Sequence, residues 1–276
     1  MRTSVVIATR DRARDLANTL TRLRALNPVP PIIVVDNGST DDTADRVRAG
    51  FPGVRLIRLP ENVGMAARNL GVEAADTPYV AFSDDDSWWA QGSLTQAEVL
   101  FDAYPRVGLV AATTLVGPEC RRDPVCDEMA GSPLGTAPDL PGPRVLGFLA
   151  CSAVVRRSAF LDAGGFNPLL HFGAEEKLLA YDLAARGWEL CYVDRLRAHH
   201  HPSANRPSVS WRRRIERRNN VLITWMRRPA GDCARTAGLL LRDPLAAAGA
   251  LRRLPGALGA RRRLPDHVER RIRELA

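Results

Sequence analysis

The chain has 276 residues, of which 45% are hydrophobic and 25% are charged, and its formal net charge is +8. This composition excludes a disordered or fibrous protein, and a chain of this length can bury a core without disulfides. The charge is uneven, because residues 211–276 carry a net charge of +11 and residues 1–210 a net charge of −3. A basic segment of this kind is typical of a nucleic-acid contact, an anionic membrane contact or a solvated helical face.

The sequence has no run of 18 apolar residues, so we expect no transmembrane helix. The apolar run at 5–8 is too short for the core of a signal peptide. The five cysteines form no CxxC pair, which favours free thiols in a cytoplasmic protein.

The first 115 residues alternate short β-branched runs with helix-like segments. We expect strands at 5–8, 32–35, 54–59, 79–82 and 107–111, and helices at 12–26, 41–48, 65–75 and 94–104. This alternation predicts a mostly parallel sheet covered by helices on both faces. Such sheets bind ligands beyond the carboxyl ends of their strands, so the residues that follow each strand are the candidates for a site.

The second half of the chain is less regular. Residues 115–145 hold ten Pro or Gly residues, which predicts a long loop of the kind that is often functional. We expect a strand at 146–155, a helix at 175–186 and a strand at 190–193, which a histidine triplet follows at 199–201. The remainder is predicted to be helical, at 211–228 and then in shorter pieces broken by Pro229, Pro244, Pro255 and Pro265.

Three consecutive aspartates, Asp84, Asp85 and Asp86, follow the apolar strand at 79–82. Adjacent carboxylates repel one another, and a divalent cation removes that cost. At the carboxyl end of a strand this pattern favours a metal site, completed by phosphate oxygens of a substrate, over a solvated acidic turn.

The strand at 32–35 leads into Asp36, a tight turn at Gly38 and a helix N-terminus. Because Asp41 and Asp42 already occupy that N-terminus, a phosphate site there is disfavoured. Asp36 is better placed to accept hydrogen bonds from a base or a ribose. Further along, Arg68 is able to pair with a carboxylate of the protein or with a phosphate.

Glu175 and Glu176 open the helix predicted at 175–186, where the helix dipole favours carboxylates. The functional alternative is a general base with an acceptor-binding neighbour. Three adjacent histidines, His199, His200 and His201, indicate a metal ligand or a phosphate contact.

Taken together, residues 3–225 resemble the inverting family-2 glycosyltransferases of GT-A fold. Asp84-Asp85-Asp86 is similar to the DxD motif of that family, and Glu175-Glu176 to its catalytic segment, which more often reads Glu-Asp. The family usually has Pro where Ala8 stands and Asn where Asp11 stands. The other matching segments are 4–12, 34–41, 62–71, 164–166, His200 (with His199 one residue away) and Arg218-Asn219.

This resemblance implies a role for each matching residue. The nucleotide-sugar-binding residues would be Thr9, Arg12, Asp36, Asn37, Arg68, Asp84 and Asp85. The ligands of Mn²⁺ or Mg²⁺ would be Asp86, His200 and Asp84, and the imidazole favours Mn²⁺. Glu176, with Glu175 beside it, would be the general base. At an ordinary pKa of about 4.3 it is ionised and a weak base.

The predicted organisation is a GT-A domain at 1–228 and a basic helical extension at 229–276. The GT-A domain divides into a nucleotide-sugar-binding half at 1–114, an acceptor-side loop at 115–145 and an acceptor and catalytic half at 146–228. The expected reaction moves a sugar from a UDP-, dTDP- or GDP-sugar to the hydroxyl of a glycan, a lipid-linked or a small-molecule acceptor. The expected settings are polysaccharide, cell-envelope glycolipid and secondary-metabolite biosynthesis in bacteria.

Two other classes of protein stay open. A sugar nucleotidyltransferase would need a glycine-rich turn after the first strand, and this turn has no glycine. The other class is a non-enzymatic basic protein that binds membranes or nucleic acid. We expect no nucleic acid, and we expect the basic extension to contact the inner face of the cell membrane. The leucines among its arginines are Leu239–Leu241, Leu245 and Leu251.

Overall fold

The computed structural model describes residues 1–203, 207–240 and 243–275. One sheet forms its centre, in the strand order β3-β2-β1-β4-β8-β6-β9-β5, and β7 pairs with β6. The strands are β1 (Thr3–Thr9), β2 (Ile32–Asp36), β3 (Arg55–Arg58), β4 (Tyr79–Ser83), β5 (Ser87–Trp89), β6 (Val107–Val116), β7 (Arg121–Arg122), β8 (Ala153–Arg156) and β9 (Glu189–His200).

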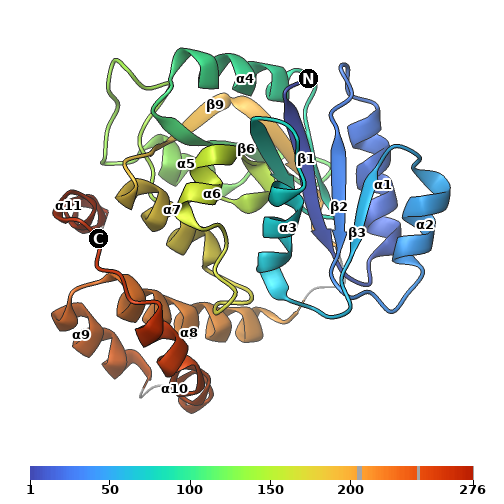
Figure 1. Cartoon of the computed structure of the whole chain (residues 1–276). Helices are drawn as coiled ribbons and strands as arrows, with labels where there is room; N and C mark the ends of the chain where they lie inside the picture. Colours follow the sequence, from blue (N-terminus) through green and yellow to red (C-terminus); the bar gives the residue numbers. More distant parts are fainter. Residues whose placement is uncertain (204–206, 241–242, 276) are drawn as a thin grey trace.

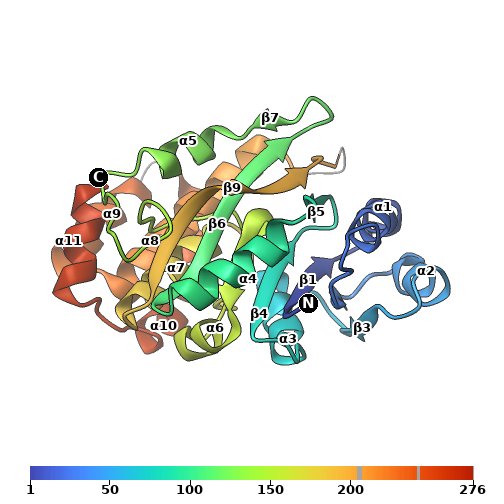
Figure 2. The ribbon, with the colours of Figure 1, turned by 90° about the horizontal axis from the view of Figure 1, so that it is seen from above.

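Helices cover both faces of this sheet. They are α1 (Ala13–Arg24), α2 (Thr43–Gly50), α3 (Ala67–Glu73), α4 (Ser93–Ala103), α5 (Pro124–Ala130), α6 (Arg157–Ala163), α7 (Glu175–Ala185), α8 (Val209–Arg227), α9 (Ala230–Leu240), α10 (Pro244–Gly259) and α11 (Asp266–Glu274). Both views place α1 and α2 at the β1–β3 end of the sheet and α8–α11 on the far side, beside α7 (Figure 1 and Figure 2).

The strands β3, β2, β1 and β4 are parallel to their neighbours, so their carboxyl ends share one edge of the sheet. Beyond β4 the sheet is mixed, because β8 runs antiparallel to both β4 and β6, whereas β9 runs parallel to β6. The short β5 pairs antiparallel with the end of β9, with Ser87 opposite His200. This pairing carries the chain that follows β4 across to the end of β9.

Alternating side chains of the strands feed two cores, one on each face of the sheet. Val5 and Ile7 of β1 pack with the buried stripe of α1 and with α4, and Val6 packs on the opposite face with α3, α6 and α7. The core on the face of Val6 continues into α8, α10 and α11, where it includes Ala250 and Val268. The helices of the basic extension therefore share a hydrophobic core with the rest of the chain.

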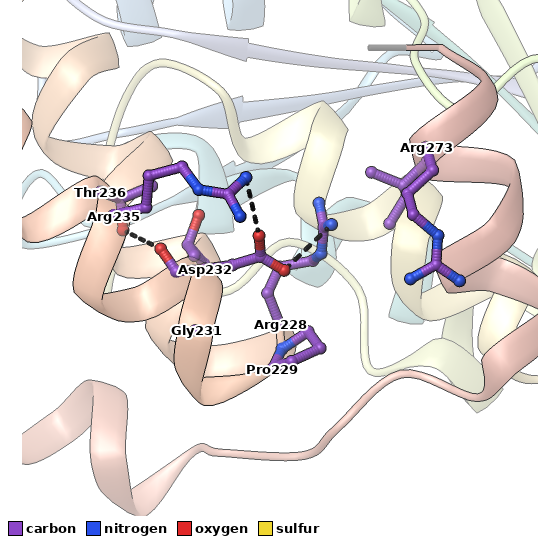
Figure 3. Close-up of a pocket in the computed structure, with 9 residues that line it drawn as sticks. Arg228, Pro229, Gly231, Asp232, Arg235, Thr236 and Arg273 are labelled. Carbon is purple, nitrogen blue, oxygen red and sulfur yellow. Dashed lines mark hydrogen bonds and ion pairs between the residues drawn. The ribbon is translucent and has the colours of Figure 1, made fainter.

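Ion pairs also tie the C-terminal helices together. A cavity of about 490 Å³ lies between α8, α9 and α11. In it Asp232 lies between Arg228 and Arg235, at 3.2 and 3.4 Å (Figure 3). Arg271 reaches from α11 to Glu189 at the start of β9, at 3.0 Å. Part of the positive charge of residues 211–276 is thus neutralised inside the protein.

The predicted alternation of strands and helices over the first 115 residues is confirmed. The strand expected at 146–155 is wrong in extent, because only Ala153–Arg156 is a strand and the short turn η2 (Ala150–Ser152) precedes it. Leu146 and Phe148 are buried without being in a strand. An apolar run in the sequence does not distinguish a buried strand from a buried segment of another conformation. The loop expected at 115–145 contains β7 and α5, whose first turn is capped by Asp123.

Two further expectations are wrong in detail. His199 and His200 lie inside β9 rather than after it, because a bulge near Val193 lets the strand continue. Pro255 does not break α10, and the buried Ala250 and Ala257 on either side of it anchor the helix to the core. The predicted breaks at the other three prolines coincide with helix starts.

In the part of the chain that the structure describes, no helix is long and apolar enough to cross a membrane. Leu241 and the side chain of Leu239, both expected at the membrane, lie outside the described residues. The domain boundaries at 114, 145 and 228 stay predictions.

Candidate active site

Asp84, Asp86 and His200 come together at the edge where β4 ends. Because Ser87 pairs with His200, the two aspartates just before β5 reach this histidine. One ligand atom of each of the three residues lies within 4.8 Å of the others, and Nε2 of His200 is 3.3 Å from Oδ1 of Asp86. Two carboxylates and an imidazole form a donor set that can hold a divalent cation.

His199 points away from this triad, since neighbouring residues of a strand face opposite sides. Its ring stacks on Trp88, with centroids 5.5 Å apart and an interplanar angle of 14°. Its Nδ1 lies 3.7 Å from Sγ of Cys120. Of the two histidines that the sequence left open, His200 is therefore the one that faces the aspartates.

The third aspartate, Asp85, is buried and ties the end of β1 to the cluster. Its carboxylate accepts hydrogen bonds from Oγ1 of Thr9 and from Nη1 of Arg12, both at 2.9 Å. Burial raises the pKa of Asp85 to about 6, against the opposing charge of Arg12. The Arg12 guanidinium also lies 3.6 Å from Asp86, so it offsets part of the negative charge of the cluster.

Asp36 is fully buried at the end of β2, and its two carboxylate oxygens differ. Oδ1 accepts a hydrogen bond from the backbone N–H of Ser39 at 2.9 Å. Oδ2 has no hydrogen-bond partner among the described residues and lies 3.6 Å from Nε of Arg58. A buried carboxylate oxygen without a donor is costly, which suits an atom that a ligand satisfies.

Asn37 uses its side-chain amide within the protein. The NH₂ group donates to Oδ1 of Asn62 and to the carbonyl oxygen of Gly64, at 2.9 and 3.0 Å. The amide oxygen accepts from the backbone N–H of Val63 at 2.9 Å. Asn37 therefore holds the 62–64 turn, and any contact with a nucleotide stays a prediction.

Arg68 is only 2% exposed and forms an ion pair with Asp84. It lies in the first turn of α3, and its Nη1 also lies 2.9 Å from Sδ of Met65. This arginine therefore places a positive charge beside the aspartates. Its Nε has no hydrogen-bond partner among the described residues.

Glu175 and Glu176 begin α7, and the charges of Arg68 and Asp84 act on the pKa of both. Glu175 is 3% exposed, and burial together with the charge of Glu176 raises its pKa. Burial also raises the pKa of Glu176, so the expectation of an ordinary pKa was wrong. The physical reason is desolvation, which sequence does not report.

Two parts of the site were not predicted. The backbone N–H of Ser203 donates to Oδ2 of Asp86 at 2.9 Å, and a backbone donor leaves no sequence signal. A cavity of about 600 Å³ also opens beside Asp86, between α1, Trp88 and His201. The residues of α1 and its C-terminal end that line it are Asp15, Asn18, Thr19, Thr21, Arg22 and Ala25.

The family model and the relatives that match this chain define it as a glycosyltransferase. Residues 4–163 match the family model described as Glycosyl transferase family 2, and the chain belongs to this family. It is similar to a mannosyltransferase from Pyrobaculum calidifontis, solved in complex with GDP-Man and Mn²⁺. The TM-score is 0.64 at 21% identity, over 94% of this chain and 75% of that one. The GT-A fold is thereby confirmed.

Two relatives come from Mycobacterium tuberculosis. The pre-mycofactocin glycosyltransferase is 33% identical over 197 residues, which are 68% of this chain and 40% of that protein. The N-acetylglucosaminyl-diphospho-decaprenol L-rhamnosyltransferase is 27% identical over 210 residues, 62% of this chain and 66% of that protein. The chain thus spans less than half the length of the first relative.

Proposed function

We propose that the protein is a metal-assisted, inverting glycosyltransferase that moves a sugar from a nucleotide-sugar donor to an acceptor hydroxyl. The observation that carries this proposal is the gathering of Asp84, Asp86 and His200 at the edge of the sheet where β4 ends. The three ligand atoms suit Mn²⁺, with Mg²⁺ as the alternative because it prefers oxygen ligands. When bound, such an ion supplies positive charge that stabilises the leaving nucleoside diphosphate.

The chain's own residues bind the donor. Oδ2 of Asp36, which accepts no hydrogen bond from the described residues, accepts one from the nucleoside. Arg58 lies beside this oxygen and within reach of the same ligand. Thr9 and Arg12 line the base side, and Arg68 faces the diphosphate while Asp84 contacts the ribose. Asp85 and Asn37 support this site chiefly by holding the loops around it.

Glu176 takes the proton of the acceptor hydroxyl as its oxygen attacks the anomeric carbon. The bond from that carbon to the diphosphate breaks on the opposite face, so a single displacement inverts the anomeric centre. Burial raises the pKa of Glu176, which makes its carboxylate a better proton acceptor than an exposed one. Burial raises the pKa of both carboxyl groups, and the charge of Glu176 raises that of Glu175 further, which favours a single negative charge on the pair.

The donor is tested with a panel of UDP-, dTDP- and GDP-sugars in the presence of Mn²⁺, with nucleoside diphosphate release as the readout. A glycosyltransferase releases the diphosphate from at least one donor, and Asp86→Ala abolishes that release. A sugar nucleotidyltransferase would instead release pyrophosphate from a nucleoside triphosphate and a sugar phosphate. Pyrophosphate release without diphosphate release would contradict the proposal.

The proposed acceptor is a hydroxyl on a glycan, a lipid-linked saccharide or a small molecule of the bacterial cell envelope or secondary metabolism. The lipid-linked class is supported by the name of the rhamnosyltransferase relative and by α10. Its exposed Leu245, Leu251 and Leu258 stand among arginines, as in helices that lie on anionic membranes. Sedimentation with phosphatidylglycerol vesicles, lost in a Leu251→Ser/Leu258→Ser variant, tests this peripheral contact. Equal sedimentation of both proteins would contradict it.

A further inference from the structure

The residues just before Glu175 have an unusual backbone conformation. His171, Gly173 and Ala174 all have positive φ angles, of 61°, 84° and 63°. For His171 and Ala174 this left-handed conformation is unfavourable, and it persists only where the surrounding structure enforces it. Because Ala174 directly precedes α7, its conformation sets the direction in which Glu175 and Glu176 leave the loop.

One buried side chain fixes this loop. Asn219 of α8 is 0% exposed, and its amide nitrogen lies 3.0, 2.8 and 2.6 Å from the carbonyl oxygens of Leu170, Phe172 and Gly173. The amide has two hydrogens for three carbonyl oxygens, so two of these oxygens share one hydrogen. Three carbonyl groups of one short segment thus bind the same amide group of α8.

The amide of Asn219 is itself held in one orientation. Its oxygen accepts from Nε of Arg218 at 2.9 Å, and Nη2 of Arg218 reaches the carbonyl oxygen of Leu170 at 3.2 Å. Burial lowers the pKa of Arg218 to about 10, which reflects how far this guanidinium is withdrawn from water. Across the loop, the backbone N–H of Met65 donates to the carbonyl oxygen of His171 at 2.7 Å. The loop is therefore fixed between α8 and the segment that leads to Arg68.

We infer that Asn219 is a positioning residue for the general base, acting through the 170–174 loop to hold Glu176 at the reacting atoms. This inference rests on the proposed role of Glu176. Asn219 has the position that such a role needs, since its NH₂ group donates to backbone carbonyl oxygens of the segment that leads directly into α7. A misplacement of about 1 Å at a reacting centre can cost on the order of 100-fold in rate, so a positioning residue away from the reacting atoms can control turnover.

The test uses the donor that the nucleotide-sugar panel selects, with Mn²⁺ and with water as the acceptor. In this hydrolysis, a water oxygen bonds to the anomeric carbon as the bond to the diphosphate breaks. The water proton passes to Glu176. The variants are Asn219→Asp, which keeps the shape and the acceptor for Arg218 but loses the NH₂ donors, and Asn219→Ser, which keeps one donor. Asn220→Asp is the matched control, because Asn220 is the next residue of α8 and an aspartate there can still accept from Lys177.

We expect both Asn219 variants to lower kcat by roughly 10- to 100-fold while the KM for the donor stays within about two-fold. The rise in melting temperature that nucleoside diphosphate and Mn²⁺ produce is retained. The acidic limb of the kcat profile moves to lower pH, because a loosened loop admits water to Glu176. Asn219→Ser keeps more activity than Asn219→Asp, and Asn220→Asp keeps the rate of the natural protein.

Several results would overturn the inference. Folded Asn219 variants with an unchanged kcat would do so, as would a loss confined to the KM for the donor. Failure of both variants to fold would also count against it, since the residue would then serve the fold as a whole. Glu176→Gln is measured in parallel: if it retains turnover, the proposed base is wrong. If Glu176→Gln loses turnover while the Asn219 variants do not, only the positioning role of Asn219 is wrong.

Discussion

Replacing Glu176 by glutamine removes the proposed proton acceptor with almost no change in shape. The backbone N–H of Ala150 donates to the Glu176 carboxylate, and a glutamine oxygen can accept the same bond. Loss of a general base costs about 100- to 10,000-fold in rate, which is about 2.7–5.4 kcal/mol of transition-state stabilisation. We therefore expect kcat to fall by that factor and the dissociation constant of the donor to stay within about two-fold.

The assay is nucleoside diphosphate release in the presence of Mn²⁺, over a range of pH. The ionised form of Glu176 is the active one, so kcat of the natural protein falls as the pH drops through its pKa. Because burial raises that pKa, the fall begins closer to neutral pH than for an exposed glutamate. The residual kcat of Glu176→Gln does not show this fall at low pH. Glu73→Gln, on the exposed side of α3, is the control. Turnover above about a tenth of the natural rate in Glu176→Gln would refute the assignment.

Three other predictions follow from the same geometry. Burial raises the pKa of Glu175 above its unfolded value, so its protonated form stabilises the fold at low pH and this stabilisation is lost as pH rises through the folded pKa. Glu175→Gln should then raise the melting temperature more at pH 8 than at pH 5, and an equal shift at both would contradict the burial argument. His200→Ala should weaken Mn²⁺ binding at least ten-fold in calorimetry, whereas His199→Ala should leave it unchanged; the reverse order would refute the ligand set. Asp36→Asn should raise the KM for the donor about ten-fold with little effect on kcat, since it removes one charge-assisted hydrogen bond; an unchanged KM would exclude Asp36 from nucleoside binding.

The arrangement of the site around β1, β2 and β4 was predictable from sequence. Strands that alternate with helices align their carboxyl ends, so Asp36 and Asp84 had to fall on one edge once the alternation was recognised. The resemblance favoured His200, with His199 one residue away, and what separates the two in the structure is the pairing of β5 with β9 and a bulge inside β9. Neither feature follows from local propensity.

Sequence also could not tell which polar side chains the protein uses internally. Asn37 and Asn219 both belong to recognisable motifs, yet their amides bind backbone groups of distant turns. The raised pKa of Glu176 depends chiefly on its burial in the folded chain. These are tertiary properties, whereas residue spacing reports only which types of side chain are available.

The central claim is that Asp84, Asp86 and His200 hold a divalent ion on which the donor's diphosphate rests. Anomalous scattering at the manganese edge, from crystals grown with Mn²⁺ and the nucleoside diphosphate of the selected donor, tests it most directly. We expect a single strong peak bounded by the Asp86 carboxylate and Nε2 of His200, with the diphosphate beside it. A peak at another group of residues, or none at this edge of the sheet while the diphosphate is bound, would contradict the claim.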